Sequence, residues 1–119
     1  MRFLNNNYTK IYFNIIASAN ARITEGYVEK HHILPKSLGG ANDASNLVKL
    51  SAREHFICHL LLIRMTSGKD RTKMLRAVQA FCRLKKTNRS LTSRQYQVAR
   101  TLTAGLPSWN KGKTIADYT

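Results

Sequence analysis

The apolar residues near the start of the chain recur at intervals of three and four positions. They are Tyr8, Ile11, Tyr12, Ile15, Ile16 and Ala19. This spacing places their side chains along one face of an α-helix, so it predicts a helix that begins near Tyr8. Asn6 or Asn7 is the expected N-cap, because an asparagine oxygen can accept a hydrogen bond from a free N–H group of the first turn.

Short β-type runs replace the helical period after this segment. Residues 27–34, YVEKHHIL, are rich in strand-forming residues and are bounded by Gly26 and Pro35, which predicts a strand. Residues 36–46, KSLGGANDASN, are mostly turn formers, so we expect a loop there. LVKL at 47–50 predicts a second short strand. Together the two strands would form a small hairpin around the loop.

Two helices are expected to follow the hairpin. SARE at 51–54 has the Ser-x-x-Glu spacing of a capping box, so a helix should begin at Ser51, continue to about Met65 and stop near Gly68. A further helix fits residues 70–86. Its inward side chains would be Met74, Leu75, Val78, Phe81 and Cys82.

A last helix fits about residues 92–104, because Thr92 has Gln95 three positions later and Gly105 is a typical residue after a helix end. The final stretch, LPSWNKGKTIADYT, has no period and is expected to be an extended tail. The pattern therefore predicts one mostly α domain with a small β-hairpin over residues 1–104, followed by a tail at 105–119.

Composition narrows the class of partner. The chain has 20 Lys and Arg against 6 Asp and Glu, a formal net charge of +14 and a pI near 10.4. Folding does not require this excess, because like charges repel one another in the compact state. A polyanion accounts for the charge best, and nucleic acid is the commonest one. A basic protein that binds ribosomes or membrane surfaces is the alternative.

Other features exclude several environments. No apolar run approaches the roughly twenty residues of a membrane span, and the first residues lack the apolar stretch of a secretion signal. We therefore expect a cytoplasmic protein, of a cell or of an infected host, with no membrane partner. Cys58 and Cys82 both fall in apolar helical patterns, which indicates buried free thiols. Because the sequence holds no CxxC pair, zinc-ribbon folds are excluded.

The histidines carry the clearest chemical signal. His55 and His59 are four positions apart on a predicted helix, so both rings lie on one face and can bind one metal ion. His31 and His32 are neighbours on a predicted strand, so their side chains point to opposite sides. One of them can join the helical pair, which leaves the other for proton transfer. Each of these histidine patterns alone has an ordinary explanation, such as a partly buried ring. Their occurrence together is difficult to explain by chance.

Three segments resemble the ββα-metal motif of HNH endonucleases. The resemblance covers about residues 27–62 and is carried by EKHHILPKSLGG, NLVKL and AREHFICHLLL. The residues around these segments are similar to those of small phage-encoded HNH endonucleases of the homing type. GLPSWNKGK, at 105–113, resembles the Asn-Lys-Gly-Lys modular DNA-binding motif that accompanies such nucleases. The implied fold is a ββα-metal (His-Me finger) core at about 27–66 flanked by helices.

The resemblance also implies roles for individual residues. His31, His55 and His59 would be the metal ligands, and His32 would be the general base. Asn46 would fix the loop that holds His32. Glu29 would orient a ligand through the distal N–H of its ring. One divalent ion is expected: three nitrogen ligands favour Zn²⁺ or Ni²⁺, with Mg²⁺ or Mn²⁺ as ions that could support turnover.

Double-stranded DNA is the expected partner. Lys73, Arg76 and Arg83 would share the side of their helix opposite the apolar set, where phosphate contact is plausible. In the tail, Trp109, Lys111 and Lys113 suit an extended segment that follows a DNA groove. The alternatives are a solvated basic helix face and a frayed terminus.

The sequence thus predicts a metal-dependent DNA endonuclease or nickase, which would act as a homodimer or bind twice to cut both strands. One alternative is a non-catalytic DNA-binding module with a structural zinc, for which Cys58 could supply a fourth ligand. A nuclease assisting phage genome packaging is another, although the CxxC zinc knuckles that would support it are absent from the sequence.

Overall fold

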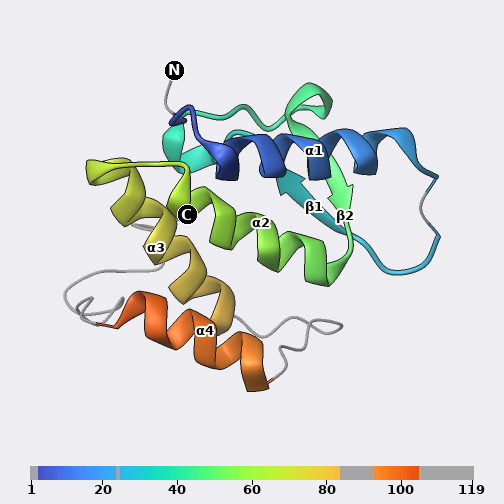
Figure 1. Ribbon diagram of the computed structural model, residues 1–119. Helices are drawn as coiled ribbons and strands as arrows, with labels where there is room; N and C mark the ends of the chain where they lie inside the picture. Colours follow the sequence, from blue (N-terminus) through green and yellow to red (C-terminus); the bar gives the residue numbers. More distant parts are fainter. Residues whose placement is uncertain (1–2, 24, 84–92, 105–119) are drawn as a thin grey trace.

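The computed structural model describes residues 3–23, 25–83 and 93–104. The described part is mostly helical, with four α-helices and one two-stranded antiparallel sheet (Figure 1). The elements are α1 (Asn7–Ala21), β1 (Glu29–His32), β2 (Leu47–Leu50), α2 (Ala52–Arg64), α3 (Gly68–Arg83) and α4 (Ser93–Thr103). Two 3₁₀ turns, Lys36–Leu38 and Ala44–Asn46, lie between the strands. The predicted fold class, mostly α with a small hairpin, is confirmed.

The first helix begins as its cap predicts. Asn6 is the N-cap, and its side-chain oxygen accepts a hydrogen bond of 3.0 Å from the Thr9 N–H. Tyr12, Ile16 and Ala19 are buried. The apolar face is narrower than predicted, because the main contacts of α1 among the described elements are with α2 and β2. Two residues at the edge of the predicted face are therefore largely exposed, Tyr8 at 42% and Ile11 at 48%.

The strands pair in a register that fixes the position of each histidine. Glu29 is opposite Leu50, Lys30 opposite Lys49, His31 opposite Val48 and His32 opposite Leu47. The second strand agrees with its predicted bounds.

The first strand is shorter than the predicted 27–34, because pairing beyond His32 passes to Asn46. The Ile33 N–H donates to the Asn46 carbonyl at 2.9 Å. The Leu34 N–H donates to the Asn46 side-chain oxygen at 2.9 Å. This side chain therefore replaces the backbone partner that a longer second strand would supply.

The capping box at the start of α2 is present. The Ser51 hydroxyl accepts from the Glu54 N–H at 3.2 Å, and the Glu54 carboxylate accepts from the Ser51 N–H at 2.9 Å. Arg22, just past the end of α1, forms an ion pair with the same carboxylate. The hydrogen bond from Arg22 lowers the pKa of Glu54 to about 2. Glu54 thus caps the first turn of α2 and, through Arg22, links α2 to the end of α1.

The later helices agree with their predictions except at the boundaries. Gly68, with a φ of 57°, begins α3 after a connection of three residues, 65–67, that follows α2. The helix is described to Arg83, so the predicted residues 84–86 lie outside the described part. α4 lies within one residue of its predicted bounds. No described helix has the length and apolar character needed to cross a membrane.

The helices pack against one another in the order in which they occur along the chain. α1 packs on α2, α2 on α3 and α3 on α4, while the hairpin packs against α1 and α2 (Figure 1). On α3, Met74 and Val78 are buried and Leu75 is partly buried, as predicted. The side chains of Phe81 and Cys82 lie outside the described part. This packing places the inner face of β1 against α2, where the predicted metal ligands are.

Candidate metal and catalytic site

Three histidines from two elements converge in the interior. Alternation along β1 turns Glu29 and His31 toward α2 and leaves Lys30 and His32 on the outer face. On α2, the spacing of four residues places His55 and His59 one turn apart. As a result, ligand atoms of His31, His55 and His59 all lie within 4.8 Å of one another. The structure thus brings together the three residues that the sequence proposed as ligands.

The geometry of the three rings suits one shared cation. The ring centroid of His31 is 5.1 Å from that of His55 and 5.3 Å from that of His59. The Nε2 atoms of His55 and His59 are 3.1 Å apart. Two nitrogens bound to one tetrahedral ion at about 2.0–2.1 Å lie about 3.3 Å from each other. The helical pair is therefore already close to the separation that shared binding requires.

Glu29 makes the contact expected of it. Nδ1 of His55 donates a hydrogen bond of 2.6 Å to Oε1 of Glu29. The Tyr27 hydroxyl donates to the other carboxylate oxygen. Glu29 is only 7% exposed, and its contact with His55 is buried. Because Nδ1 of His55 carries the hydrogen, its Nε2 carries the lone pair that faces His59.

His31 is the most deeply buried of the three rings, with 2% of its surface exposed. Burial, followed by the nearby rings of His55 and His32, lowers the pKa of His31 to about 3. A neutral imidazole is the form that binds a metal ion. Its Nε2 lies 2.7 Å from the Tyr12 hydroxyl on α1, a contact that the sequence did not reveal.

His32 lies outside the cluster formed by its neighbour. Its side chain is half-buried on the outer face of the hairpin, and its Nε2 is 2.9 Å from Oδ1 of Asn42. An amide oxygen only accepts hydrogen bonds, so Nε2 of His32 carries the hydrogen. Its Nδ1 then carries the lone pair and can accept a proton. The predicted separation of the two adjacent histidines is thus present in the structure.

Asn46 holds the loop between the strands. Its side chain accepts from the Leu34 N–H and donates to the Leu34 carbonyl at 2.9 Å and to the Ala41 carbonyl at 2.8 Å. Gly40 lies so close that a Cβ atom there would be 1.7 Å from the Leu34 carbonyl oxygen. Asn46 therefore ties the end of the loop to its start, at Leu34, and to its middle, at Ala41 next to Asn42.

Cys58 is buried but is not a member of the histidine cluster. Burial raises the pKa of its thiol to about 12, whereas metal ligation needs the thiolate.

The predicted DNA-binding residues are only partly described. Lys73 is exposed, and its Nζ donates to the Ser37 carbonyl at 3.2 Å. Arg76 is half-buried and donates to Oε1 of Gln79 at 3.2 Å. The side chain of Arg83 lies outside the described part, as do Trp109, Lys111 and Lys113. The role of these residues in DNA binding stays a prediction.

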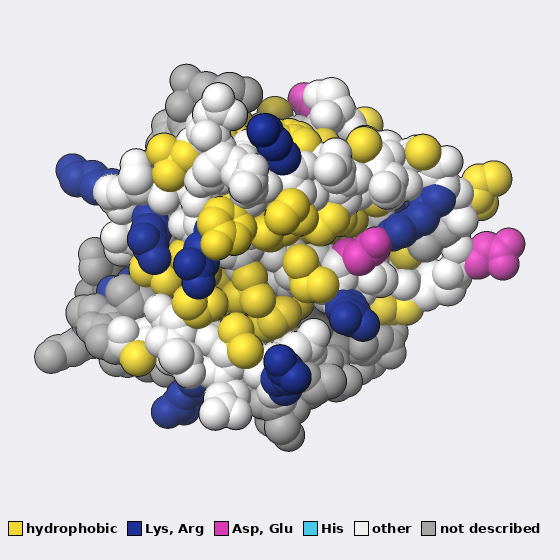
Figure 2. Space-filling model, viewed as in Figure 1, with side chains coloured by type: hydrophobic (Ala, Val, Ile, Leu, Met, Phe, Trp, Pro, Cys, Tyr) yellow, Lys and Arg dark blue, Asp and Glu magenta, His cyan; other side chains and the backbone are white. Residues whose placement is uncertain are grey.

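A groove of about 590 Å³ lies on another face, lined by residues of α2 and α4 together with Tyr8. Figure 2 shows hydrophobic side chains gathered on this face, with Lys and Arg around them. None of the described residues that line the groove is a histidine, a cysteine or a carboxylate. The candidate chemistry therefore belongs to the histidine cluster and not to this hollow.

Three contact residues of the site were missed by sequence reasoning: Tyr12, Tyr27 and Asn42. Tyr12 belongs to an apolar helix face, Tyr27 to a β-type run and Asn42 to a loop rich in turn formers. From the sequence, each of these residues has an ordinary structural explanation, because its residue type is common in the element that contains it. Only Tyr27 has a spacing that could have revealed it, because residues 27, 29 and 31 share one face of the predicted strand.

Sequence comparison identifies relatives of the chain. It is 37% identical over 118 residues to probable mobile endonuclease E of Enterobacteria phage T4, an alignment that covers 95% of this chain and 79% of that protein. The chain belongs to the family of phage mobile endonucleases.

Two further mobile endonucleases of the same phage are similar over shorter shares of their length. Probable mobile endonuclease D is 40% identical over 103 residues, and probable mobile endonuclease C is 38% identical over 98 residues. The alignments cover 79% of this chain in both cases but only 39% and 44% of those two proteins. No protein-family model and no solved structure matches the chain.

Proposed function

We propose that this protein is a metal-dependent DNA endonuclease of the HNH type, whose ββα-metal core consists of β1, β2 and α2. One observation carries the proposal: His31, His55 and His59 converge while His32, next in the chain, lies outside their cluster. A structural metal site has no need of the fourth histidine. The names of the relatives, which are probable mobile endonucleases of a phage, support the endonuclease activity in this proposal.

The donor set fits a divalent cation. Three imidazole nitrogens suit Zn²⁺ or Ni²⁺, and Mg²⁺ or Mn²⁺ remain candidates for turnover. Three protein ligands also leave a coordination position for substrate, as catalytic sites require. A bound cation would supply charge neutralisation at the phosphate and stabilisation of the departing 3′ oxygen. Glu29 holds the ring of His55 in the orientation that presents Nε2.

The proton transfer belongs to His32. With Nε2 bound to Asn42, its Nδ1 is the atom that takes a proton from the attacking water. Asn46 keeps the surrounding loop in place through its hydrogen bonds with Leu34 and Ala41. The products would carry 5′-phosphate and 3′-hydroxyl ends.

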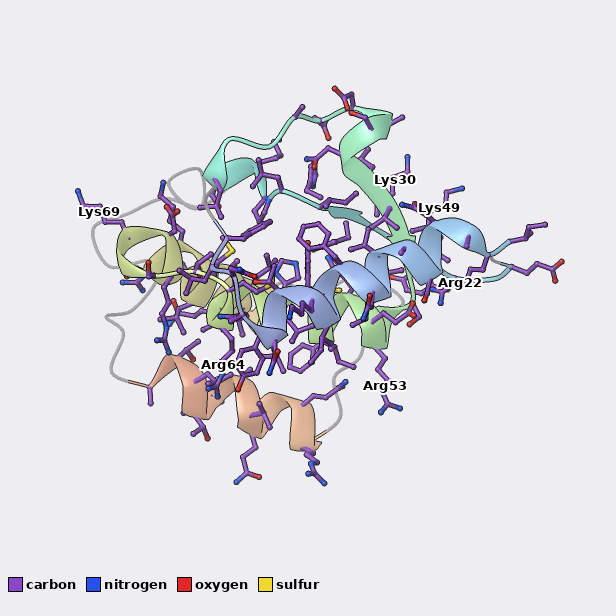
Figure 3. All side chains as sticks on the ribbon, turned by 45° about the horizontal axis from the view of Figure 1, so that its top comes forward. Arg22, Lys30, Lys49, Arg53, Arg64 and Lys69 are labelled. Carbon is purple, nitrogen blue, oxygen red and sulfur yellow. The ribbon has the colours of Figure 1, made fainter. Side chains whose placement is uncertain are left out.

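The DNA would approach over the outer face of the hairpin. Lys30 and Lys49 are direct cross-strand partners on this face, and alternation along β1 places His32 on the same side as Lys30. Both lysines are exposed, and neither forms an ion pair with a residue that the structure describes. Figure 3 shows the two side chains next to each other on the hairpin. Like charges directly opposite each other destabilise a hairpin, and phosphate groups would offset this repulsion.

Plasmid relaxation tests the proposal. With a divalent metal the wild-type protein should convert supercoiled plasmid into nicked or linear forms, and EDTA should stop the reaction. His32→Ala should lower cleavage by about 10²–10⁴-fold and leave metal affinity unchanged, because only the base is removed. His59→Ala should lose both metal and cleavage. If His32→Ala releases the metal, the roles of the two adjacent histidines are reversed.

The same assay separates the enzyme from a binding module with structural zinc. Such a module would bind metal and DNA without relaxing plasmid, and its closed site would need a fourth ligand. Cys58→Ser tests this requirement. We expect unchanged metal affinity, because Cys58 is not a member of the histidine cluster. A homodimer stays a prediction, and the ratio of nicked to linear product at increasing protein concentration tests it.

A further inference from the structure

Tyr12 links the first helix to the candidate metal centre. It is fully buried in the middle of α1, and its hydroxyl oxygen lies 2.7 Å from Nε2 of His31. The same oxygen lies 2.7 Å from the backbone carbonyl oxygen of Ile33. The hydroxyl thus bridges a proposed ligand and the backbone just beyond β1. The sequence motif that suggested the site does not include this residue.

Counting hydrogens fixes the direction of both bonds. A tyrosine hydroxyl has one hydrogen to donate, and a carbonyl oxygen can only accept. The hydrogen of Tyr12 therefore goes to Ile33, and the hydroxyl oxygen accepts from His31. Nε2 of His31 must then carry a hydrogen, so Nδ1 holds the lone pair. If Nε2 lacked the hydrogen, two buried acceptors would compete for one donor, which costs free energy.

We propose that Tyr12 is a positioning residue for this centre: its hydroxyl holds His31 as the Nε2–H tautomer and so makes Nδ1 the nitrogen that binds the cation. The tautomer follows from the contacts of the protein alone, whereas the effect on the cation rests on the proposed function. Tyr12 would do for His31 what Glu29 does for His55. His31 and His55 would then each have one nitrogen hydrogen-bonded to the protein and the other available to the cation.

The aromatic ring and the hydroxyl of Tyr12 have separable roles. The ring packs edge-on against Phe13 at a centroid distance of 5.2 Å and against Phe3 at 6.1 Å. Tyr12→Phe keeps these contacts and removes only the oxygen. Tyr8→Phe is a matched control, because Tyr8 is on the same helix and 42% exposed. Comparison of the two variants therefore separates the effect of removing a buried hydroxyl from that of removing an exposed one.

The experiment has two readouts that do not depend on cleavage. The first is the tautomer of His31 in the metal-free wild-type protein, measured by ¹⁵N NMR of the imidazole ring, with His31→Gln used to assign the signal. Nε2 should carry the hydrogen. The second is Zn²⁺ affinity, measured by competition with a chelator. Tyr12→Phe should weaken Zn²⁺ binding by about 10–100-fold, and Tyr8→Phe should leave it unchanged.

Specific results would overturn the proposal. A hydrogen on Nδ1 of His31 in the wild-type protein would refute the tautomer, and equal Zn²⁺ affinity in wild type and Tyr12→Phe would refute the positioning role. The melting temperatures of the two tyrosine variants in EDTA show whether each is folded. If wild type binds no Zn²⁺, the proposed function fails instead, and the NMR measurement still decides the tautomer.

Discussion

The two adjacent histidines of β1 have different surroundings because side chains alternate between the faces of a strand. His31 is enclosed between α1 and α2, where it contacts Tyr12 and lies beside His55 and His59. His32 is half-buried on the outer face and contacts Asn42. Burial lowers the pKa of His31 and so favours the neutral ring that a bound cation would need, whereas the proposed proton transfer belongs to the less buried His32.

The burial of His31 predicts how metal-free stability depends on pH. Its pKa is lowered to about 3 in the folded protein, because burial disfavours the charged ring. In the unfolded chain an imidazole takes up its proton near pH 6.5. Between these values the unfolded state binds the extra proton. The free energy of unfolding should therefore fall as pH decreases through this window, by up to about 1.4 kcal/mol per pH unit, and the contribution is fully present above pH 6.5.

Urea unfolding in EDTA at pH 7.5, 6.0 and 5.0 measures this dependence. His31→Gln is the matched variant, because it keeps a polar side chain of similar size and cannot titrate. The loss of stability between pH 7.5 and 5.0 should be smaller in the variant than in the wild type. Equal losses would mean that other groups, such as His55 or His59, account for the whole effect.

At the scale of elements, the loop between the strands is shaped by close contacts and not by pairing alone. Asn46 replaces a strand partner for Leu34, and Gly40 lies against the same carbonyl group. The neighbouring Gly39 differs, because it has a φ of 97° and open space around its Cβ position. The two glycines are thus needed for different reasons, one for space and the other for backbone conformation.

Replacing each of the two glycines by alanine should distinguish the need for space at Gly40 from the need for a positive φ at Gly39. In Gly40→Ala the new Cβ must displace the Leu34 carbonyl or the Asn46 amide, so the loop that carries Asn42 moves. Misplacement by about 1 Å can cost about 100-fold in rate, so cleavage should fall by this order while Zn²⁺ affinity stays unchanged. Gly39→Ala should cost about 1–3 kcal/mol of stability from backbone strain but keep most of the cleavage rate. Equal cleavage by both variants would contradict this account.

The elements themselves were largely predictable from sequence. The cap of α1, the capping box of α2 and the bounds of β2 follow from local patterns, because each depends on residues within four positions of one another. The overestimated length of β1 has the opposite cause. Its end depends on Asn46, which is twelve residues from Leu34, and no local pattern reports that contact.

At the scale of the whole molecule, the net charge of +14 indicates a polyanionic partner but does not by itself show where DNA binds. The groove face in Figure 2 is basic but carries no candidate catalytic group. The outer hairpin face combines the cross-strand pair Lys30 and Lys49 with His32. This combination favours the hairpin as the side presented to the scissile strand.

Salt dependence of DNA binding tests this assignment. In a His32→Ala background, which prevents cleavage, replacing Lys30 and Lys49 by glutamine should reduce the slope of log K against log salt by about 1.8. The control double variant is Lys69→Gln with Arg71→Gln, also exposed; Figure 3 shows Lys69 far from the hairpin. Lys49→Glu should raise the melting temperature, because a cross-strand ion pair replaces repulsion, and should lower DNA affinity. Equal slopes for the two double variants would argue against the hairpin face.

The sequence by itself determined the helices, the hairpin and the division of the four histidines into three that can meet and one that cannot. These features depend on the periods of helix and strand, which are properties of neighbouring residues. The tertiary structure decided which atoms those rings present. The partners Tyr12, Glu29 and Asn42 contact His31, His55 and His32 across 19, 26 and 10 positions of the chain. The first two contacts exist only after the hairpin has packed against α1 and α2, and the third only after the loop between the strands has folded back toward β1.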